Sequence, residues 1–227
     1  MFFTLAENLE THTHRHMNKV NYQAELDKII AGNQAADITP TLLLHACCAP
    51  CSSYVLEYLS QYFRITVYYF NPNIYPEKEY LYRKSELSRL ISEMRFTNPV
   101  FVADCDYDSS DFFGAVKGLE HCPEGGERCF ECYRLRLENT ARTAKELGSD
   151  FFASTLSISP LKNAQKLNEI GECLAGKYSV KWLPNDFKKR EGYKRSIILS
   201  QEHSLYRQNY CGCVFSKNSN DDPDGTV

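Results

Sequence analysis

Short apolar runs alternate with longer amphipathic stretches along most of the chain. The runs are typical of buried strands, which we expect at about 41–46, 65–70, 99–104, 150–156 and 178–183. The stretches between them have helical periodicity and predict helices at about 52–60, 76–94, 129–148, 159–176 and 190–203, with a further one within 104–120. Strands that alternate with helices favour βα units. The pattern predicts an α/β fold with a doubly wound, mainly parallel five-stranded sheet.

The domain organisation follows from where this pattern starts and stops. We expect an N-terminal tail and short helix over 1–40, one α/β domain over 41–216 and a disordered C-terminal tail over 217–227. The short helix, YQAELDKIIAG, should end at Gly32. A cysteine-bearing loop and helix near 105–147 is expected as an insertion. The tail histidines are not expected to form a preorganised metal site; they are His12, His14 and His16.

Composition narrows the class of protein. A hydrophobic content of 43% and an aromatic content of 13% are typical of a folded globular chain. No apolar run reaches the roughly 18 residues of a membrane helix, and the start lacks a signal-peptide pattern. We therefore expect a cytoplasmic protein with no membrane partner. The net charge of −3 argues against a polyanion-binding molecule as a whole, although KKREGYKR forms a local basic run that is either a solvated face or a phosphate-facing patch.

Cysteine usage changes the picture most. The chain has ten cysteines, and in a reducing compartment clustered cysteines serve metal binding or redox chemistry more often than structural disulfides. Seven of them fall into three tight groups: Cys47, Cys48 and Cys51; Cys129 and Cys132; Cys211 and Cys213. The first group directly follows the first strand, at the edge of a parallel sheet where ligands bind. The three groups together predict one shared metal or redox site.

The identity of the metal stays open at this level. Closed structural zinc needs four ligands, which Cys48, Cys51, Cys129 and Cys132 could supply. A [4Fe–4S] cluster also takes four cysteines, and three sulfurs would then remain for a second metal or a redox pair. The count favours iron–sulfur over zinc. Of the other cysteines, Cys105 lies on the functional edge, Cys122 is undecided and Cys173 should pack in the core.

Five motifs together resemble one family. HACCAPC, YFNPNIYP, GGERCFECYRLRL, STLSISPLKN and YRQNYCGCVFS occur in order between about 41 and 216, and they resemble the cobalamin-independent epoxyqueuosine reductases of the QueH type. The resemblance implies a nucleotide-binding fold of the HUP type, which is Rossmann-like. It also implies reduction of epoxyqueuosine to queuosine at the wobble position of tRNA, with a [4Fe–4S] cluster beside a single iron ion.

The resemblance also assigns roles to residues. It implies cluster ligands at Cys47, Cys48, Cys129 and Cys132. Cys51 stands where some family members have aspartate, so a thiolate would hold the second iron here. Cys211 and Cys213 match the family's C-G-C and are expected to be redox-active or to lie against the metals. Proton donors for the epoxide oxygen are expected at Tyr133 or His45, although a histidine on an apolar strand is more often a satisfied core residue.

The expected partners are tRNA and an unidentified electron donor. An anticodon loop can splay a base for stacking on aromatic side chains such as Tyr69, Phe70 and Tyr75. Lys162 in SISPLKN could hold a phosphate at a helix N-terminus, unless Ser159 simply caps that helix. The remaining candidates for the tRNA backbone belong to the basic run: Lys188, Lys189, Arg190, Lys194 and Arg195.

Other classes of protein are compatible with parts of this pattern. A zinc-stabilised nucleotide- or RNA-binding protein without redox activity would use the same cysteines. A PP-loop tRNA thiolase is disfavoured because HACCAPCSS fills the place of its S-G-G-x-D-S loop and has no glycine for a phosphate. A thiol–disulfide oxidoreductase could use C-A-P-C, but Cys47 and the two distant pairs would have no role.

Overall fold

The fold is built on one parallel sheet, as predicted. The computed structural model describes residues 20–216, so the expectations for the tail histidines and for 217–227 lie outside the described residues. Five strands pair in the order β3-β2-β1-β4-β5, and every pair is parallel. The strands are β1 (Thr41–His45), β2 (Arg64–Tyr68), β3 (Val100–Ala103), β4 (Phe151–Ser154) and β5 (Lys181–Trp182).

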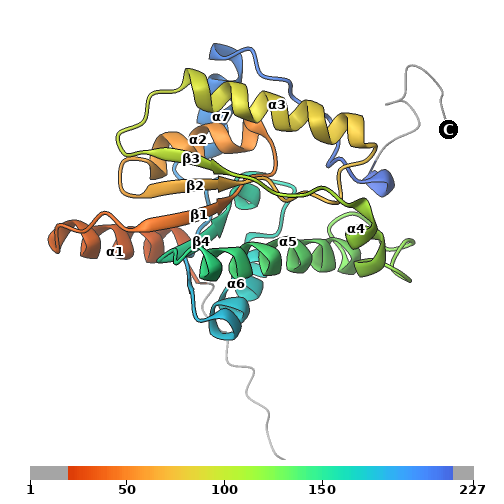
Figure 1. The fold of residues 1–227 in the computed structure, drawn as a ribbon, viewed down its shortest axis with the longest axis horizontal. Coiled ribbons are helices and arrows are strands. Elements are labelled where there is room, and N and C mark those ends of the chain that lie inside the picture. The colour runs from red at the N-terminus through yellow and green to blue at the C-terminus, as the bar shows by residue number, and fades with distance from the viewer. Residues whose placement is uncertain (1–19, 217–227) are drawn as a thin grey trace, which may run out of the picture.

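Helices cover both faces of this sheet. In Figure 1, α2, α3 and α7 lie on one side of the strands, and α5 and α6 lie on the other. The α-helices are α1 (Tyr22–Ala35), α2 (Ala49–Leu59), α3 (Glu77–Glu93), α4 (Ser109–Ala115), α5 (Glu127–Glu146), α6 (Ala164–Tyr178) and α7 (Gly192–Glu202). Two short 3₁₀ helices, η1 (Thr155–Ile158) and η2 (Val214–Ser216), complete the fold. The doubly wound architecture is confirmed.

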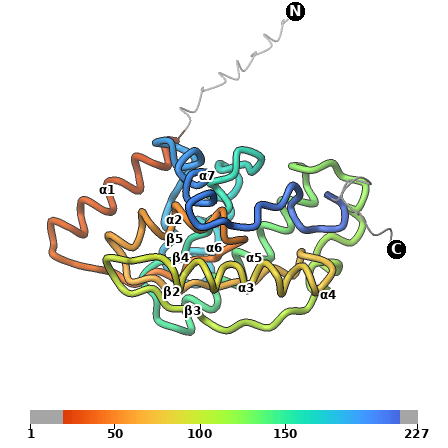
Figure 2. Tube along the Cα trace, turned by 90° about the horizontal axis from the view of Figure 1, so that it is seen from above, coloured from red at the N-terminus to blue at the C-terminus, as the bar shows by residue number. Residues whose placement is uncertain are grey.

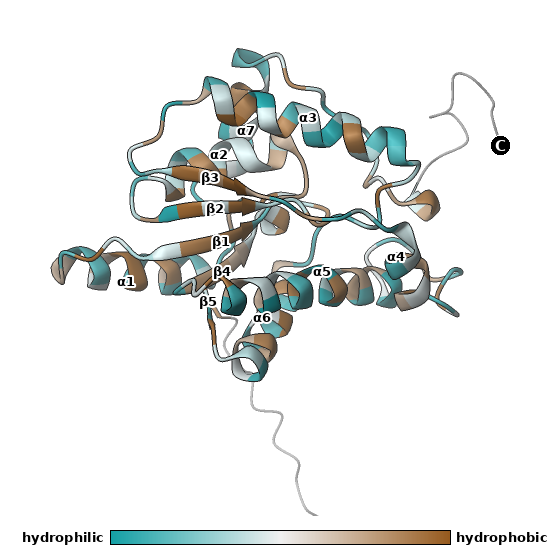
Figure 3. Cartoon of the chain, viewed as in Figure 1, coloured by the Kyte–Doolittle hydropathy of each residue, from teal (hydrophilic) through white to brown (hydrophobic). Residues whose placement is uncertain are grey.

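The hydropathy of the elements explains why they form these layers. The strands of the sheet are largely hydrophobic, whereas the covering helices are hydrophilic on their outer sides (Figure 3). Strands β1 and β4 are buried nearly throughout because both of their faces are covered. Within residues 20–216, no helix combines the length and the apolar character that crossing a membrane requires.

The segment predicted as an insertion is more regular than expected. Helix α5 packs on β1 and β4, so it is the crossover helix that covers the second face of the sheet. Its buried stripe, Tyr133, Leu137, Ala141 and Ala144, follows the spacing of one helical face. The start of α5, α4 and the loop between them extend beyond the ends of the strands (Figure 1).

The N-terminal helix belongs to the packed unit. Leu26 and Ile30 of α1 are part of the main hydrophobic core, so this unit begins before residue 41. The predicted end of α1 at Gly32 was wrong. The helix continues to Ala35, and its last turn closes with the N–H of Ala36 on the carbonyl of Gly32. A glycine with helical backbone angles does not by itself end a helix.

Candidate metal centre

The crevice of the sheet opens at the carboxyl ends of β1 and β4. Strand β1 pairs with β2 on one side and with β4 on the other, so the winding of the chain reverses between β1 and β4. Ligands of open α/β sheets bind at such a point. A cavity of about 570 Å³ lies here, and its lining includes Cys47, Cys48, Cys51 and Cys211.

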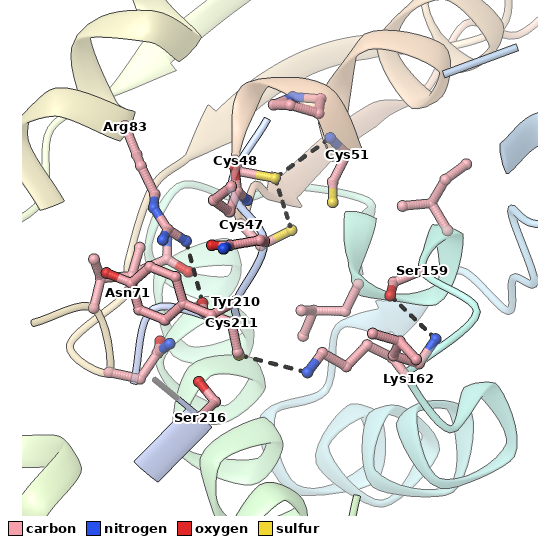
Figure 4. Close-up of a pocket in the computed structure, with 18 of the residues that line it drawn as sticks. Cys47, Cys48, Cys51, Asn71, Arg83, Ser159, Lys162, Tyr210, Cys211 and Ser216 are labelled. Atoms are coloured by element: carbon pink, nitrogen blue, oxygen red, sulfur yellow. Dashed lines mark hydrogen bonds between the residues drawn. The ribbon is translucent and has the colours of Figure 1, made fainter. Parts of the chain in front are cut away.

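The first cysteine group forms a compact set of sulfurs. The Sγ atoms of Cys47, Cys48 and Cys51 all lie within 4.8 Å of one another. Cys48 is the N-cap of α2, and its sulfur accepts a hydrogen bond of 3.4 Å from the N–H of Cys51. Thr155 at the end of β4 donates its hydroxyl to Cys47 Sγ at 3.3 Å. Figure 4 shows the three side chains at one wall of the cavity.

The three thiols share protons unequally. Hydrogen bonds from Cys47 and Cys51 hold the pKa of Cys48 well below its ordinary value of 9.0. The hydrogen bond to Cys48 raises the pKa of Cys47 to about 11. A soft metal ion would replace the thiol protons of this group. This donor set fits a thiolate-bound metal centre.

The third cysteine group is split by a glycine in a backbone conformation that other residues rarely adopt. Gly212 has φ of +104°, and a Cβ there would lie 3.0 Å from Arg83 and from Ile74. This turn places Cys211 at the cavity, with its sulfur 3.5 Å from Lys162 Nζ. Cys213 instead packs in a small apolar cluster. The C-x-C spacing therefore contributes one sulfur to the cavity and one behind it.

The second cysteine group lies behind the cavity wall. Cys129 is in the first turn of α5, where its sulfur accepts from the N–H of Gly125 at 3.2 Å. Cys132 is buried against Phe112 and Cys213, and burial raises its pKa to about 12. Among residues 20–216, the only group of three or more candidate ligand atoms within 4.8 Å is the first cysteine group. The role of Cys129 and Cys132 as cluster ligands stays a prediction.

The two predicted proton donors are both inside the protein. His45 is fully buried, and its ring nitrogens lie 2.9 Å from Ser154 Oγ and 3.0 Å from the carbonyl oxygen of Phe70. Burial lowers its pKa to about 4. Tyr133 is 1% exposed, and burial raises its pKa to about 12. Neither residue belongs to the cavity lining, so the geometry favours a scaffold role for His45.

Lys162 differs from its expected place. Helix α6 begins at Ala164 with Asn163 as its cap, so the alternative that Ser159 caps this helix is excluded. Lys162 precedes the helix, its side chain is 9% exposed, and it pairs with Glu124. Figure 4 shows it reaching towards Cys211. Lys162 is therefore a cation of the cavity instead of a surface lysine.

The basic run lies at the start of α7 and is largely paired with acids. Its ion pairs join Lys188 to Asp186, Arg190 to Asp27, Lys194 to Glu191, and Arg195 to both Glu57 and Glu202. In the part of the chain that the structure describes, Lys189 has no ion pair within 4.0 Å. These acids offset much of the positive charge that the sequence of the run suggests.

The expected stacking residues have different fates. Tyr69 and Phe70 are core residues with 1% and 6% exposure, whereas Tyr75 is 47% exposed. Tyr75 also pairs edge-on with Phe113 of α4. Only Tyr75 of the three is accessible to a base.

The three cysteines outside these groups differ in their burial and contacts. Cys105 is half-buried with its sulfur 3.7 Å from Tyr80 Oη. The carbonyl of Cys122 accepts from Arg128. Cys173 is exposed, so the expectation that it packs in the core was wrong. It lies on the outer side of α6, where the helical pattern alone could not distinguish the two faces.

Several polar residues of the cavity were missed by sequence reasoning. Each of them has a buried side-chain atom without a hydrogen-bond partner: Asn73 Oδ1, Arg83 Nη2, Arg136 Nη2 and Gln208 Oε1. Two of them are arginines on amphipathic helices, where arginine usually faces solvent. Unpartnered buried atoms are expected at sites that bind a ligand.

Comparison with known proteins decides the family. The model of the family "Epoxyqueuosine reductase QueH" matches residues 42–219, most of the chain. The chain belongs to this family. An epoxyqueuosine reductase QueH from Streptococcus pyogenes is 44% identical over 200 residues, which cover 87% of this chain and 78% of the relative. One from Thermotoga maritima is 35% identical over 182 residues, covering 78% and 90%.

A more distant likeness concerns the fold. The U34-tRNA thiolase NcsA from Methanococcus maripaludis, solved with its [4Fe-4S] cluster, superposes with a TM-score of 0.48 at 14% identity and covers 86% of this chain and 68% of that one. So distant a likeness assigns no ligand here. Membership of the epoxyqueuosine reductase family, with sulfurs gathered in the crevice, favours an enzyme over a zinc-stabilised RNA-binding protein without redox activity.

Proposed function

We propose that the protein reduces epoxyqueuosine to queuosine at the wobble position of tRNA, in the cytoplasm. The observation that carries this proposal is the convergence of Cys47, Cys48 and Cys51 within 4.8 Å at the wall of a cavity of about 570 Å³, in a chain of this family. Soft sulfur donors at the ligand-binding edge of the sheet suit a redox metal centre.

Two metal groups would share the cysteines. We assign Cys47, Cys48, Cys129 and Cys132 to a [4Fe–4S] cluster, and Cys51 with the Cys211–Cys213 turn to an adjacent iron ion. When bound, these groups supply electrons one at a time and a Lewis acid for the epoxide oxygen. Thr155 orients Cys47 through the two hydrogen bonds that the residues exchange.

The reaction consumes two electrons and two protons. Both C–O bonds of the epoxide break, an alkene forms, and the oxygen leaves as water. The electrons come from a separate donor. Negative charge gathers on the leaving oxygen, and Lys162 Nζ offers a positive charge inside the cavity, held there by Glu124 and close to Cys211. Tyr133 and His45 would act from behind the wall, by orienting the groups that line it.

The tRNA would approach from the open side of the cavity. Tyr193 and Ser196 of α7 contribute to its lining, so the basic run beside them can follow the phosphate backbone. Lys189 and Lys194 are the best placed for phosphates, because both are exposed and the ion pair of Lys194 with Glu191 is itself exposed. Lys188, Arg190 and Arg195 hold less exposed acids of the protein itself. Exposed Tyr75 offers a stacking surface.

An anaerobic metal analysis with a matched control tests the proposal. Iron, acid-labile sulfide and zinc are measured per chain for the wild type, Cys47→Ser and Cys173→Ser, and each protein is then assayed on tRNA that carries epoxyqueuosine. The wild type and the exposed-cysteine control should hold about five irons and four sulfides and form queuosine. Cys47→Ser should lose both properties. One zinc without sulfide would overturn the mechanism and favour the RNA-binding alternative.

A further inference from the structure

Arg136 is a buried arginine in the middle of the cysteine groups. It lies on α5, is 2% exposed and belongs to the cavity lining. Its Nε donates to the carbonyl oxygen of Cys132 at 3.2 Å, and its Nη1 donates to Asn71 Oδ1 at 3.4 Å. Its Nη2 has no partner. One end of the guanidinium is therefore held by the protein and the other is free for a ligand.

Nothing in the described chain neutralises this charge. Among residues 20–216, no carboxylate oxygen lies within 4.0 Å of the Arg136 guanidinium. A second buried arginine of the cavity differs: Arg83 is equally buried, but its Nε pairs with Glu79 at 2.7 Å. An unpaired buried charge costs several kcal/mol, so a fold that keeps one has an anion to place beside it.

The surroundings of Arg136 are rich in sulfur. Cys47 and Cys211 line the same cavity as Arg136, and the carbonyl oxygen of Cys132 accepts its Nε hydrogen bond. These residues come from all three cysteine groups. Cys132 is also its neighbour one turn earlier on α5. Arg136 thus places a permanent positive charge among residues of all three cysteine groups.

We propose that Arg136 balances the negative charge of the iron–sulfur centre and raises its reduction potential. This inference rests on the proposed function. Four cysteine thiolates make a bound cluster anionic, and each reduction adds one more negative charge. A nearby cation stabilises the reduced form more than the oxidised form. Arg136 is a tuning residue that acts through the cluster and does not touch the epoxide.

A phosphate group of the RNA is the other anion that could pair with Arg136. The contacts favour the cluster, because Arg136 is held by Cys132 and Asn71 inside the protein and is 2% exposed. Phosphates of a folded RNA lie on its surface and meet exposed cations more readily. A loss of tRNA affinity without a change in the cluster would show that this choice is wrong.

The test is a redox titration of the anaerobically reconstituted protein in the absence of tRNA. Arg136→Gln removes the charge, Arg136→Lys keeps it, and Arg134→Gln removes an exposed arginine of the same helix that pairs with Glu131 and Glu138. At the wild-type midpoint, Arg136→Gln should lower the ratio of reduced to oxidised cluster at least tenfold, which is a shift of 59 mV for one electron. Arg136→Lys should change the ratio less than threefold, and Arg134→Gln should not change it.

The metal-free proteins supply a second measurement. If the charge of Arg136 is balanced only by a bound anion, it does not stabilise the metal-free fold. The metal-free Arg136→Gln protein should then melt at the wild-type temperature or above it. A lower melting temperature would mean that Arg136 holds the fold, which overturns the inference. So would a loaded Arg136→Gln protein with an unshifted potential. If the wild type itself takes up no sulfide, the proposed function fails as well, whereas the other two results leave that function intact.

Discussion

The Nδ1 atom of His45 lies 2.9 Å from the Oγ atom of Ser154. These are the last residues of β1 and β4, so the hydrogen bond joins the two strands at the point where the crevice opens. Two further hydrogen bonds join Cys47, two residues after His45, to Thr155, which directly follows Ser154. The first cysteine group is thus held by a ladder of side-chain contacts that extends the sheet beyond its last backbone pair.

Replacing Ser154 by alanine should destabilise this ladder. The change leaves a buried ring nitrogen of His45 without a partner and also removes the hydroxyl that accepts from the N–H of Leu156. We expect the free energy of unfolding to fall by about 1–3 kcal/mol. Urea unfolding of the metal-free protein measures it. Ser88→Ala, which removes an exposed helical hydroxyl, should change it by less than about 0.5 kcal/mol.

Asp150 should make stability depend on acid pH. Its carboxylate accepts hydrogen bonds from the N–H and the hydroxyl of Thr41, and these bonds hold its pKa below the ordinary 3.8. The stabilisation is therefore present above pH 3.8 and is lost as the pH falls through the lower native pKa. Because Asp150 is exposed, we expect at most about 1 kcal/mol. Unfolding of Asp150→Asn should show a weaker pH dependence there; an identical one would contradict the assignment.

Two glycines of α6 should respond with opposite signs. A Cβ at Gly171 would lie 2.3 Å from the ring of Trp182, whereas one at Gly176 would meet nothing within 4 Å. Gly171→Ala should cost about 1–3 kcal/mol because α6 must move away from β5. Gly176→Ala should stabilise the helix by about 0.5–1 kcal/mol. Thermal unfolding of both variants compares them directly, and equal effects would argue against this close packing.

Charge reversal in the basic run should weaken tRNA binding. Lys189→Glu together with Lys194→Glu should lower affinity for tRNA and reduce the slope of log affinity against log salt by about 2, one unit for each lost phosphate contact. Iron content should not change. Lys145→Glu together with Lys117→Glu, at exposed positions away from α7, is the matched control. Unchanged affinity at low salt would remove the basic run from the interface.

Position 51 should distinguish the two metals. Some family members are expected to have aspartate there, so Cys51→Asp should keep about five irons per chain, whereas Cys51→Ala should keep about four. Both variants should retain four sulfides, because the cluster ligands are assigned elsewhere. Anaerobic iron and sulfide analysis measures this. Loss of sulfide from both variants would instead make Cys51 a cluster ligand.

The architecture of the fold could be predicted from the sequence because buried strands appear as short apolar runs. The apolar runs marked all five strands. In β1 and β4 this follows from burial on both faces, whereas the edge strand β3 is apolar although Phe101 and Val102 are exposed. The residue that caps a helix was harder to predict from the sequence. Asn163, not Ser159, caps α6, and both are good capping residues. The choice depends on the η1 turn after β4, which has no signal in the apolar pattern.

Of the candidate site, the sequence revealed mainly the cysteines. Cysteine spacing identified the three groups, but spacing says nothing about depth, and Cys213 and Cys132 proved to be buried together away from the first group. Arg136 could not be recognised at all. In RLRLENTAR it reads as one of several arginines of an amphipathic helix, and its burial depends on contacts with Asn71, which is distant in the chain.

The last described segment, from α7 to Ser216, crosses the molecule towards α4 (Figure 2). It docks there through the carbonyl of Gly212, which accepts from Tyr75, and that of Cys211, which accepts from Arg83. During translation, the thiols of Cys47, Cys48 and Cys51 leave the ribosome long before this segment exists. The cavity wall that carries Cys211 is therefore the last part of the site to be synthesised, and the cavity can close only when nearly the whole chain has left the ribosome.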